Sequence, residues 1–169
     1  MAILNPEHLF DQADKLAAGV LGRPRQIDIR RAISSSYYGL FHTVMTAAAD
    51  LVIGQINRAQ PRYGLVYRSI DHKRLREFCN DVRKQALPDR YKRYAPPGGF
   101  ETAIKGFATA IVELQEKRHM ADYDPMVRMK QSDAILLTGM ARAALIRFQN
   151  ANADERTVFL SLLLFEPRK

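Results

Sequence analysis

The chain has 169 residues, a net charge of +8, 47% hydrophobic residues and a single cysteine, Cys79. This composition is ordinary for one globular domain with a sizeable core, the lone cysteine excludes an intrachain disulfide, and without a signal-peptide pattern at the start we expect a cytoplasmic protein. The longest strongly apolar run, Val158 to Phe165, is far shorter than the roughly 20 residues of a membrane-spanning helix, so we expect no membrane span.

The predicted secondary structure is helical from end to end, because apolar residues recur at steps of three and four and no segment alternates cleanly enough for a sheet. The first helix is expected to begin at Asn5-Pro6, where asparagine caps and proline fits the first turn, and to end at Gly19 or Gly22. The pattern predicts further helices over about 26–53, 65–86, 100–123 and 132–150, and a short last one between 152 and 165.

Two segments rich in proline and glycine, 54–64 and 87–99, are expected to be loops, and no repeat marks a domain boundary. Helices joined by short loops pack antiparallel, so we predict one all-α domain over residues 1–169, an antiparallel up-and-down bundle of about five helices plus a short C-terminal helix. The apolar end of the chain, 154–169, either docks on this bundle or serves a partner or a second copy.

The positive charge is concentrated in residues 58–93, which hold eleven Lys or Arg and four acidic residues. A clustered positive field favours a polyanionic partner, and its segment 89–94 interleaves three bases with two tyrosines that can stack on nucleobases. The alternative is a solvated face whose tyrosines dock back on the bundle. The candidate nucleic-acid-binding residues are Lys73, Arg76, Arg83, Arg90, Lys92 and Arg93.

A polar line runs along the predicted helix 26–53, where Arg31, Ser35, Tyr38 and His42 fall at i, i+4, i+7 and i+11. An arginine, a hydroxyl, a phenol and an imidazole in one line can bind a phosphate and move a proton. The alternative is a helix–helix contact in which these groups pair with each other or with the backbone. Aromatic and small residues at helical spacing usually pack, which favours the alternative for Ser35, Tyr37 and Tyr38.

The predicted helix 100–123 ends in a second polar group, with Arg118 four residues before Asp122 and His119 four residues before Tyr123. The first two side chains can form an ion pair along the helix, and histidine exchanges protons near neutral pH. A capping or packing role is the alternative for His119. The candidate catalytic residues are therefore Arg118, His119 and His42.

The sequence contains no motif for a metal or a cofactor, since it has no glycine-rich phosphate loop, no HExxH and no CxxC. The four histidines, at positions 8, 42, 72 and 119, and the cysteine are too scattered for metal-ligand spacing. We therefore expect neither a metal site nor a cofactor.

Two segments resemble the HEPN family (higher eukaryotes and prokaryotes nucleotide-binding). Arg30 to His42, RRAISSSYYGLFH, looks like the RRAYYAAFH-type helix of that family. Arg118 to Asp124, RHMADYD, resembles the R-x-x-A-D-Y segment that follows in one prokaryotic branch. The order of the segments matches, as does the gap between them, and the resemblance covers about 5–150.

The resemblance implies a helical bundle that forms a homodimer and binds RNA or a nucleotide. Many members are metal-independent ribonucleases, including toxins of toxin–antitoxin pairs encoded beside a small nucleotidyltransferase. Their signature, R-x(4–6)-H, places a polar residue after the arginine and closes on a histidine. Arg118 and His119 match the first two positions, but Met120 to Asp124 contains no histidine.

Three functions stay open on this basis. The first is an HEPN-like RNA- or nucleotide-binding protein of a toxin–antitoxin or defence system, and the second is an active ribonuclease in which His119 or His42 moves the proton. The third is a non-catalytic interaction module. For the first two, the expected site combines Arg118 with the family positions and polar seam, namely Arg31, Tyr38, Asp122 and Tyr123.

Overall fold

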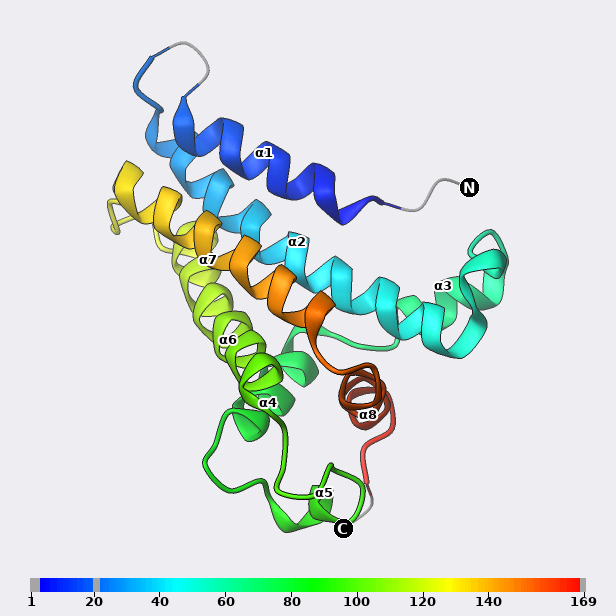
Figure 1. Ribbon diagram of the computed structural model, residues 1–169. Coiled ribbons are helices and arrows are strands. Elements are labelled where there is room, and N and C mark those ends of the chain that lie inside the picture. The colour runs from blue at the N-terminus through cyan, green and yellow to red at the C-terminus, as the bar shows by residue number, and fades with distance from the viewer. Residues whose placement is uncertain (1–3, 20–21, 168–169) are drawn as a thin grey trace.

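The computed structural model describes residues 4–19 and 22–167, and within these ranges the protein contains eight α-helices, one short 3-10 helix and no strand (Figure 1). Asn5 caps the first helix as expected, its side chain accepting a hydrogen bond from the Glu7 amide at 3.1 Å. The helices are α1 (Pro6–Ala18), α2 (Gln26–Ile53), η1 (Gln55–Asn57), α3 (Pro61–Tyr67), α4 (His72–Val82), α5 (Asp89–Lys92), α6 (Thr102–Tyr123), α7 (Gln131–Asn150) and α8 (Ala153–Leu164).

The four long helices form the predicted up-and-down bundle, with α2 packed against α1, α6 and α7 (Figure 1). Contacts along the helices give their directions: Arg30 at the start of α2 bonds to Ala121 near the end of α6, while Tyr38 further along α2 bonds to Arg118. Helices α2 and α6 are therefore antiparallel. Because three helices cover α2, apolar and small residues are buried around most of its circumference, and the all-α bundle expected from the sequence is confirmed.

The predicted helix 65–86 is wrong, because the chain forms two shorter helices there. Helix α3 already begins at Pro61, inside the expected loop, since proline fits the first turn of a helix. The chain leaves α3 after Tyr67, and the side chain of Asp71 then caps α4 by accepting a hydrogen bond from the Arg74 amide at 2.7 Å. A second short helix, α5, lies inside the other expected loop, so the bundle has more short helices than predicted.

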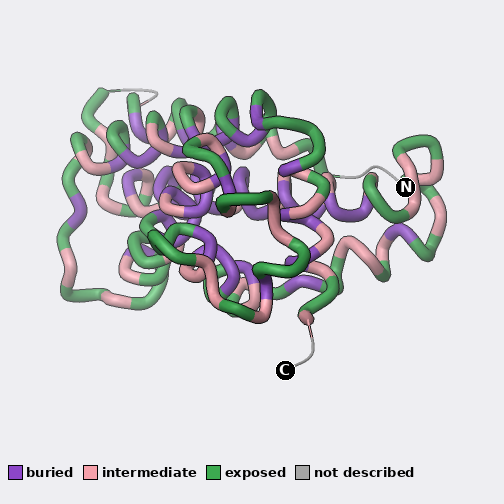
Figure 2. Tube along the Cα trace, turned by 60° about the horizontal axis from the view of Figure 1, so that its bottom comes forward, coloured by how far each residue is buried: buried purple, intermediate pink, exposed green. Residues whose placement is uncertain are grey.

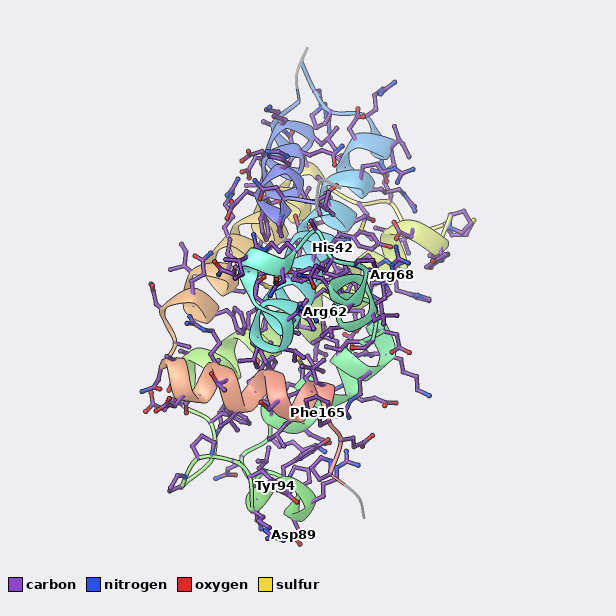
Figure 3. All side chains as sticks on the ribbon, turned by 90° about the vertical axis from the view of Figure 1, so that its right-hand side faces the viewer. His42, Arg62, Arg68, Asp89, Tyr94 and Phe165 are labelled. Carbon is purple, nitrogen blue, oxygen red and sulfur yellow. The ribbon has the colours of Figure 1, made fainter. Side chains whose placement is uncertain are left out.

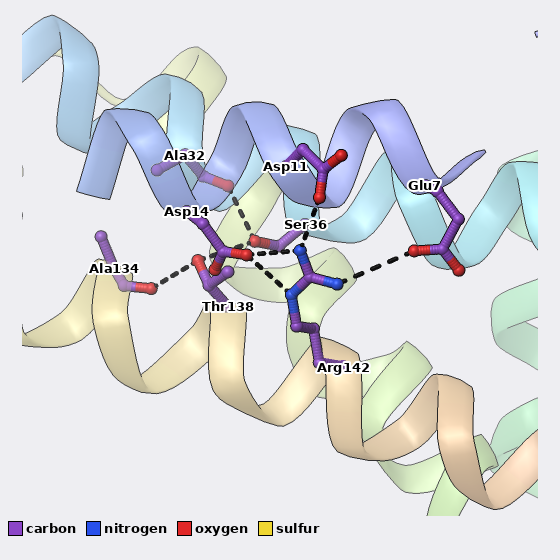
Figure 4. A network of polar contacts seen from close by, with 8 residues as sticks. All are labelled: Glu7, Asp11, Asp14, Ala32, Ser36, Ala134, Thr138 and Arg142. Atoms are coloured by element: carbon purple, nitrogen blue, oxygen red, sulfur yellow. Dashed lines mark hydrogen bonds and ion pairs between the residues drawn. The ribbon is translucent and has the colours of Figure 1, made fainter. Parts of the chain in front are cut away.

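An ion-pair network joins α1 to α7 on the surface of the bundle (Figure 4). Arg142 of α7 lies within ion-pair distance of Glu7, Asp11 and Asp14 on three successive turns of α1. Beneath this network, in the buried α2–α7 contact, the hydroxyls of Ser36 and Thr138 hydrogen-bond at 3.0 Å. These polar contacts fix the relative position of α1, α2 and α7.

The C-terminal helix α8 packs on the same core as the bundle. It buries Phe159, Leu160, Leu162 and Leu163, while Phe165 beyond its end is exposed. In Figure 2, buried stretches follow the long helices, whereas the segment from η1 to α3 is mostly exposed or half-buried. Among the described residues, no helix is both long enough and apolar enough to cross a bilayer.

We predict that Gly39→Ala destabilises the protein by about 1–3 kcal/mol, because it overpacks the α1–α2 contact. A Cβ atom at position 39 would lie 2.6–2.9 Å from three ring carbons of Phe10, and that ring is fully buried. Urea denaturation of the variant measures the loss. Gly64→Ala is the control, because no atom lies within 4 Å of a Cβ built there, and an equal loss in both variants would contradict the prediction.

Candidate functional site

The polar residues of the two opposed helices α2 and α6 meet in one group around Arg118. The guanidinium donates from Nε to Asp122 Oδ2 at 2.8 Å, and from one Nη to the hydroxyl of Tyr38 at 2.8 Å and, more weakly, to that of Tyr123 at 3.4 Å. Ser34 of α2 donates its hydroxyl hydrogen to the second oxygen of Asp122. We call Arg118, Asp122, Tyr38, Tyr123 and Ser34 the Arg118 cluster.

The Arg118 cluster is only partly open to solvent. The side chain of Arg118 is 11% exposed, that of Asp122 is 24% exposed and Tyr123 is 63% exposed. The guanidinium also lies 5.2 Å from the ring centre of Tyr38 and 5.5 Å from that of Tyr123, so two electron-rich rings flank it. An arginine held in this way is preorganised, because its orientation is fixed before any ligand binds.

Two histidines lie next to the Arg118 cluster, His42 stacked on the Tyr38 ring and His72 in an edge contact with it. The ring centre of His42 is 6.1 Å from that of Tyr38, and the ring centre of His72, at the start of α4, is 5.7 Å from it. Each imidazole shares a hydrogen bond through Nδ1 with a tyrosine hydroxyl, His42 with Tyr67 at 2.7 Å and His72 with Tyr37 at 2.8 Å. In each ring, Nε2 makes no hydrogen bond to the described residues.

Both imidazoles favour the neutral form. Burial lowers the pKa of His42, and burial together with the positive charges of Arg118 and His42 lowers the pKa of His72, against a smaller opposing effect of Asp71. Burial also raises the pKa of Tyr37, so its hydroxyl keeps its proton. A neutral imidazole whose Nδ1–H donates to tyrosine carries the lone pair of a general base on Nε2.

We predict that these two histidines make the protein less stable in mild acid. Their pKa values are lower in the folded chain than the ordinary 6.5, so below about pH 6.5 the unfolded chain binds more protons. Stability is therefore full above this pH and decreases as the pH falls through the folded values. Urea midpoints measured from pH 7.5 to 5 should decrease, and His72→Gln should reduce the slope.

The control for this pH dependence is His8→Gln, which removes an exposed imidazole on α1. It should leave the slope of the wild-type protein in place. If His72→Gln and the control both showed the wild-type decrease of the urea midpoint with falling pH, His72 would not be responsible for the loss of stability in acid.

Two residues of the predicted polar line, Arg31 and Ser35, lie apart from the Arg118 cluster, and His119 lies at its edge. Arg31 is exposed on α2 and forms no ion pair or side-chain hydrogen bond within the described residues, whereas it is the adjacent Arg30 that reaches α6. Ser35 is buried and pairs with Gln12 of α1 at 3.2 Å, as the packing alternative expects. His119 is exposed and contacts only Tyr123 among aromatic rings, at 5.0 Å between centres.

Much of the charge in the basic region 58–93 is neutralised by neighbouring acids. Arg90 pairs with Asp81 at 2.8 Å and with Glu166 at 3.1 Å. Of the other proposed nucleic-acid contacts, Lys73, Arg76 and Lys92 also have acidic partners, at 3.9, 2.8 and 2.6 Å. Arg83 and Arg93 form no ion pair within the described residues, nor do Arg62 and Arg68, which lie on the same face as His42 in Figure 3.

The two tyrosines of the segment 89–94 separate in the structure. Tyr91 is fully buried and contacts Phe78 with a ring-centre distance of 5.4 Å, whereas Tyr94 is 53% exposed, next to Arg93. Figure 3 shows Tyr94 and Phe165 on the same side of the molecule. One tyrosine therefore packs and the other is free to stack on a ligand.

Sequence reasoning missed three residues of this region, namely Ser34, Tyr67 and His72, whereas Tyr37 packs in the core as expected. Ser34 had a local signal, because it lies one turn before Tyr38 on α2. His72 had none, since it reaches the site only because the chain breaks between α3 and α4 and returns to α6. There its backbone oxygen accepts a hydrogen bond from Gln115 at 3.0 Å.

No group of three or more His, Cys, Asp or Glu residues in the described part of the chain is placed to hold a metal ion. The chain matches no protein-family model, no curated protein and no solved structure.

Proposed function

We propose that this chain is an HEPN-like protein that binds RNA at the Arg118 cluster, in the setting of a toxin–antitoxin or defence system. The observation that carries the proposal is that the two segments resembling HEPN motifs are in contact. Arg30, Ser34 and Tyr38 of the first bond to Ala121, Asp122 and Arg118 of the second. Segments some 80 residues apart in sequence thus form one polar site, as residues of a shared function would.

The chemistry of the Arg118 cluster suits a phosphate. Within the described residues, the hydrogen bonds of Arg118 use Nε and Nη2, which leaves the Nη1 hydrogens for a phosphate oxygen. The exposed ring of Tyr123 offers a face on which an unpaired base can stack, and exposed Arg31 adds positive charge on α2. Single-stranded RNA presents phosphates and unpaired bases together.

Fluorescence anisotropy with a labelled single-stranded RNA tests this proposal. We expect binding that weakens steeply between 50 and 200 mM salt, because phosphate contacts release condensed counterions. A single strand of DNA with the same sequence measures the contribution of the 2′-hydroxyl groups. Absence of binding, or binding that does not change with salt, would contradict the proposal.

A second function, metal-independent cleavage of RNA, is favoured by the two neutral imidazoles beside Arg118. Nε2 of His72 or His42 would take the proton of a 2′-hydroxyl, whose oxygen attacks the adjacent phosphorus. The bond to the 5′-oxygen breaks, and that oxygen takes up a proton from water, to which the imidazolium then returns its own, giving a 2′,3′-cyclic phosphate and a 5′-hydroxyl. Arg118 would stabilise the charge that develops on the phosphate oxygens.

Cleavage of a short RNA in the presence of EDTA, with and without a 2′-deoxy residue at the cleaved position, tests this second function. The wild type should cleave only the all-ribose strand. His72→Gln and His42→Gln identify the base, and His119→Gln is the matched control, since its ring lies outside the group around Tyr38. Equal cleavage by all three variants would contradict a role for His72 or His42.

A further inference from the structure

A separate hollow lies between α4, α5 and the start of α6, away from the Arg118 cluster. Its volume is about 330 Å³, at the lower end of the range for small-ligand pockets. We call it the lysine hollow, because three lysines from three different helical regions reach it. Its lining includes Lys84, Lys92 and Lys105 together with the apolar Val82, Leu87 and Phe100.

The charge of the lysine hollow is one-sided. Lys84 follows α4, Lys92 ends α5 and Lys105 lies in the second turn of α6, and no acidic residue lines the hollow with them. A helical side chain leans towards the N-terminus of its helix, so Lys105 extends towards the loop 96–100 that closes the hollow. Three lysines around a hollow whose own lining holds no carboxylate favour an anionic ligand.

Two of these lysines have acidic partners that do not compete strongly with a ligand. Lys84 pairs with Asp81 at 2.7 Å, but Asp81 also has Arg90 at 2.8 Å and keeps that partner when Lys84 turns away. Lys92 pairs with Asp89 at 2.6 Å, and the Asp89 side chain is 93% exposed, so water can solvate it instead. Lys105 forms no ion pair within the described residues. The Lys92–Asp89 pair is exposed on both sides, and such pairs contribute little to stability, so exchanging this pair for a ligand costs little.

The loop that closes the hollow contains two consecutive glycines. Gly98 and Gly99 have φ angles of +83° and +86°, a conformation that residues with a side chain rarely adopt, and the Gly99 amide donates to the Pro96 oxygen at 2.8 Å. Two consecutive residues without a Cβ let a ligand approach the main chain closely. The opposite part of the lining is apolar, with Val82, Leu87 and the buried Phe100.

We propose that the lysine hollow binds a phosphate monoester attached to a group of nucleoside size. The monoester carries up to two negative charges on three terminal oxygens, which three lysines can share, whereas the diester within an RNA strand carries one charge. The apolar lining takes the attached organic group. Two sources share this chemistry, namely a free mononucleotide and the 5′-phosphorylated end of an RNA strand.

Isothermal titration calorimetry of the full chain with adenosine 5′-monophosphate, and with adenosine as the phosphate-free control, tests the inference. We expect the nucleotide to bind and adenosine not to bind. Lys105→Gln should weaken nucleotide binding roughly fivefold, as expected for the loss of one charged contact, and Lys117→Gln, on the far end of the same helix, should leave it unchanged. No nucleotide binding at millimolar concentration, or equal binding by the two variants, would overturn the proposal.

Short RNA strands with a 5′-phosphate or a 5′-hydroxyl separate the two sources. Tighter binding of the phosphorylated strand, lost in Lys105→Gln, assigns the hollow to an RNA end, and nucleotide binding without that difference assigns it to a free nucleotide. The inference does not depend on the function proposed for the Arg118 cluster. Arg118→Ala should retain nucleotide binding in the lysine hollow, so failure of one proposal can be told from failure of the other.

Discussion

Replacing Phe159 by alanine should lower the free energy of unfolding by about 3–5 kcal/mol, the usual cost of deleting a buried phenylalanine ring. The ring is fully buried at the meeting point of four other phenylalanines, from α4, the loop before α6, α6 itself and α7. Its ring centre lies 5.1 Å from that of Phe78 and 6.0–6.1 Å from those of Phe100, Phe107 and Phe148. A cavity at this position therefore removes ring contacts to α4, the loop before α6, α6 and α7 at once.

The matched control is Phe165→Ala, which removes the same ring just after the same helix, where it is 67% exposed. Equilibrium denaturation in urea should show a large decrease in the midpoint for position 159 and little change for position 165. If the two substitutions cost the same, α8 is not a part of the core. This pair of variants therefore tests whether α8 contributes to the stability of its own bundle or is instead available to bind a partner.

Replacing Arg118 by alanine should weaken the binding of single-stranded RNA about 10- to 100-fold, as expected when a charged hydrogen bond to a phosphate is lost. The substitution also removes the partner of Asp122, leaving a partly buried carboxylate whose remaining contact is Ser34. The slope of log affinity against log salt should become smaller by about one, because one phosphate contact is lost. Anisotropy titrations at several salt concentrations measure both quantities.

Arg118→Lys separates charge from geometry in the same assay. Lysine keeps the positive charge but cannot donate to Asp122, Tyr38 and a phosphate in one planar arrangement, so affinity should fall between that of alanine and that of wild type. Lys15→Ala, which removes an exposed positive charge on α1, is the control and should bind like wild type. Full affinity in Arg118→Ala, with the folded state retained by circular dichroism, would exclude this arginine from the RNA site.

The course of the long helices could be predicted from the sequence because their signals are local. The apolar spacing over 26–53 and the Asn5-Pro6 cap each depend on neighbours within a few residues, and the structure has both features. The break between α3 and α4 escaped prediction. Apolar residues continue at helical spacing across it, and the cap at Asp71 takes effect only once the chain has turned there.

The candidate site was predictable only in part, for a related reason. Arg118 and Asp122 are four residues apart on one helix, so their pairing could be expected from spacing alone. The contact with Tyr38 depends on how α2 and α6 are placed against each other. The position of His72 beside Tyr38 depends on the course of the chain from α3 to α4 and on the packing of α4 against α6. Asp81 and Glu166 also neutralise the charge of Arg90, and these ion pairs cannot be foreseen from the sequence alone.

Arg30 of α2 contacts the backbone at the end of α6. Its guanidinium donates to the backbone oxygens of Ala121, Asp124 and Val127, and so satisfies carbonyls left open where α6 ends. The first arginine of the RR pair thus holds the turn after α6, while Arg118 lies in the site proposed for RNA. Across diverging sequences, Arg30 should persist wherever the architecture persists, even in copies that have lost Arg118. Under the proposed function, Arg118 would therefore mark retained RNA binding, whereas Arg30 would mark a retained fold.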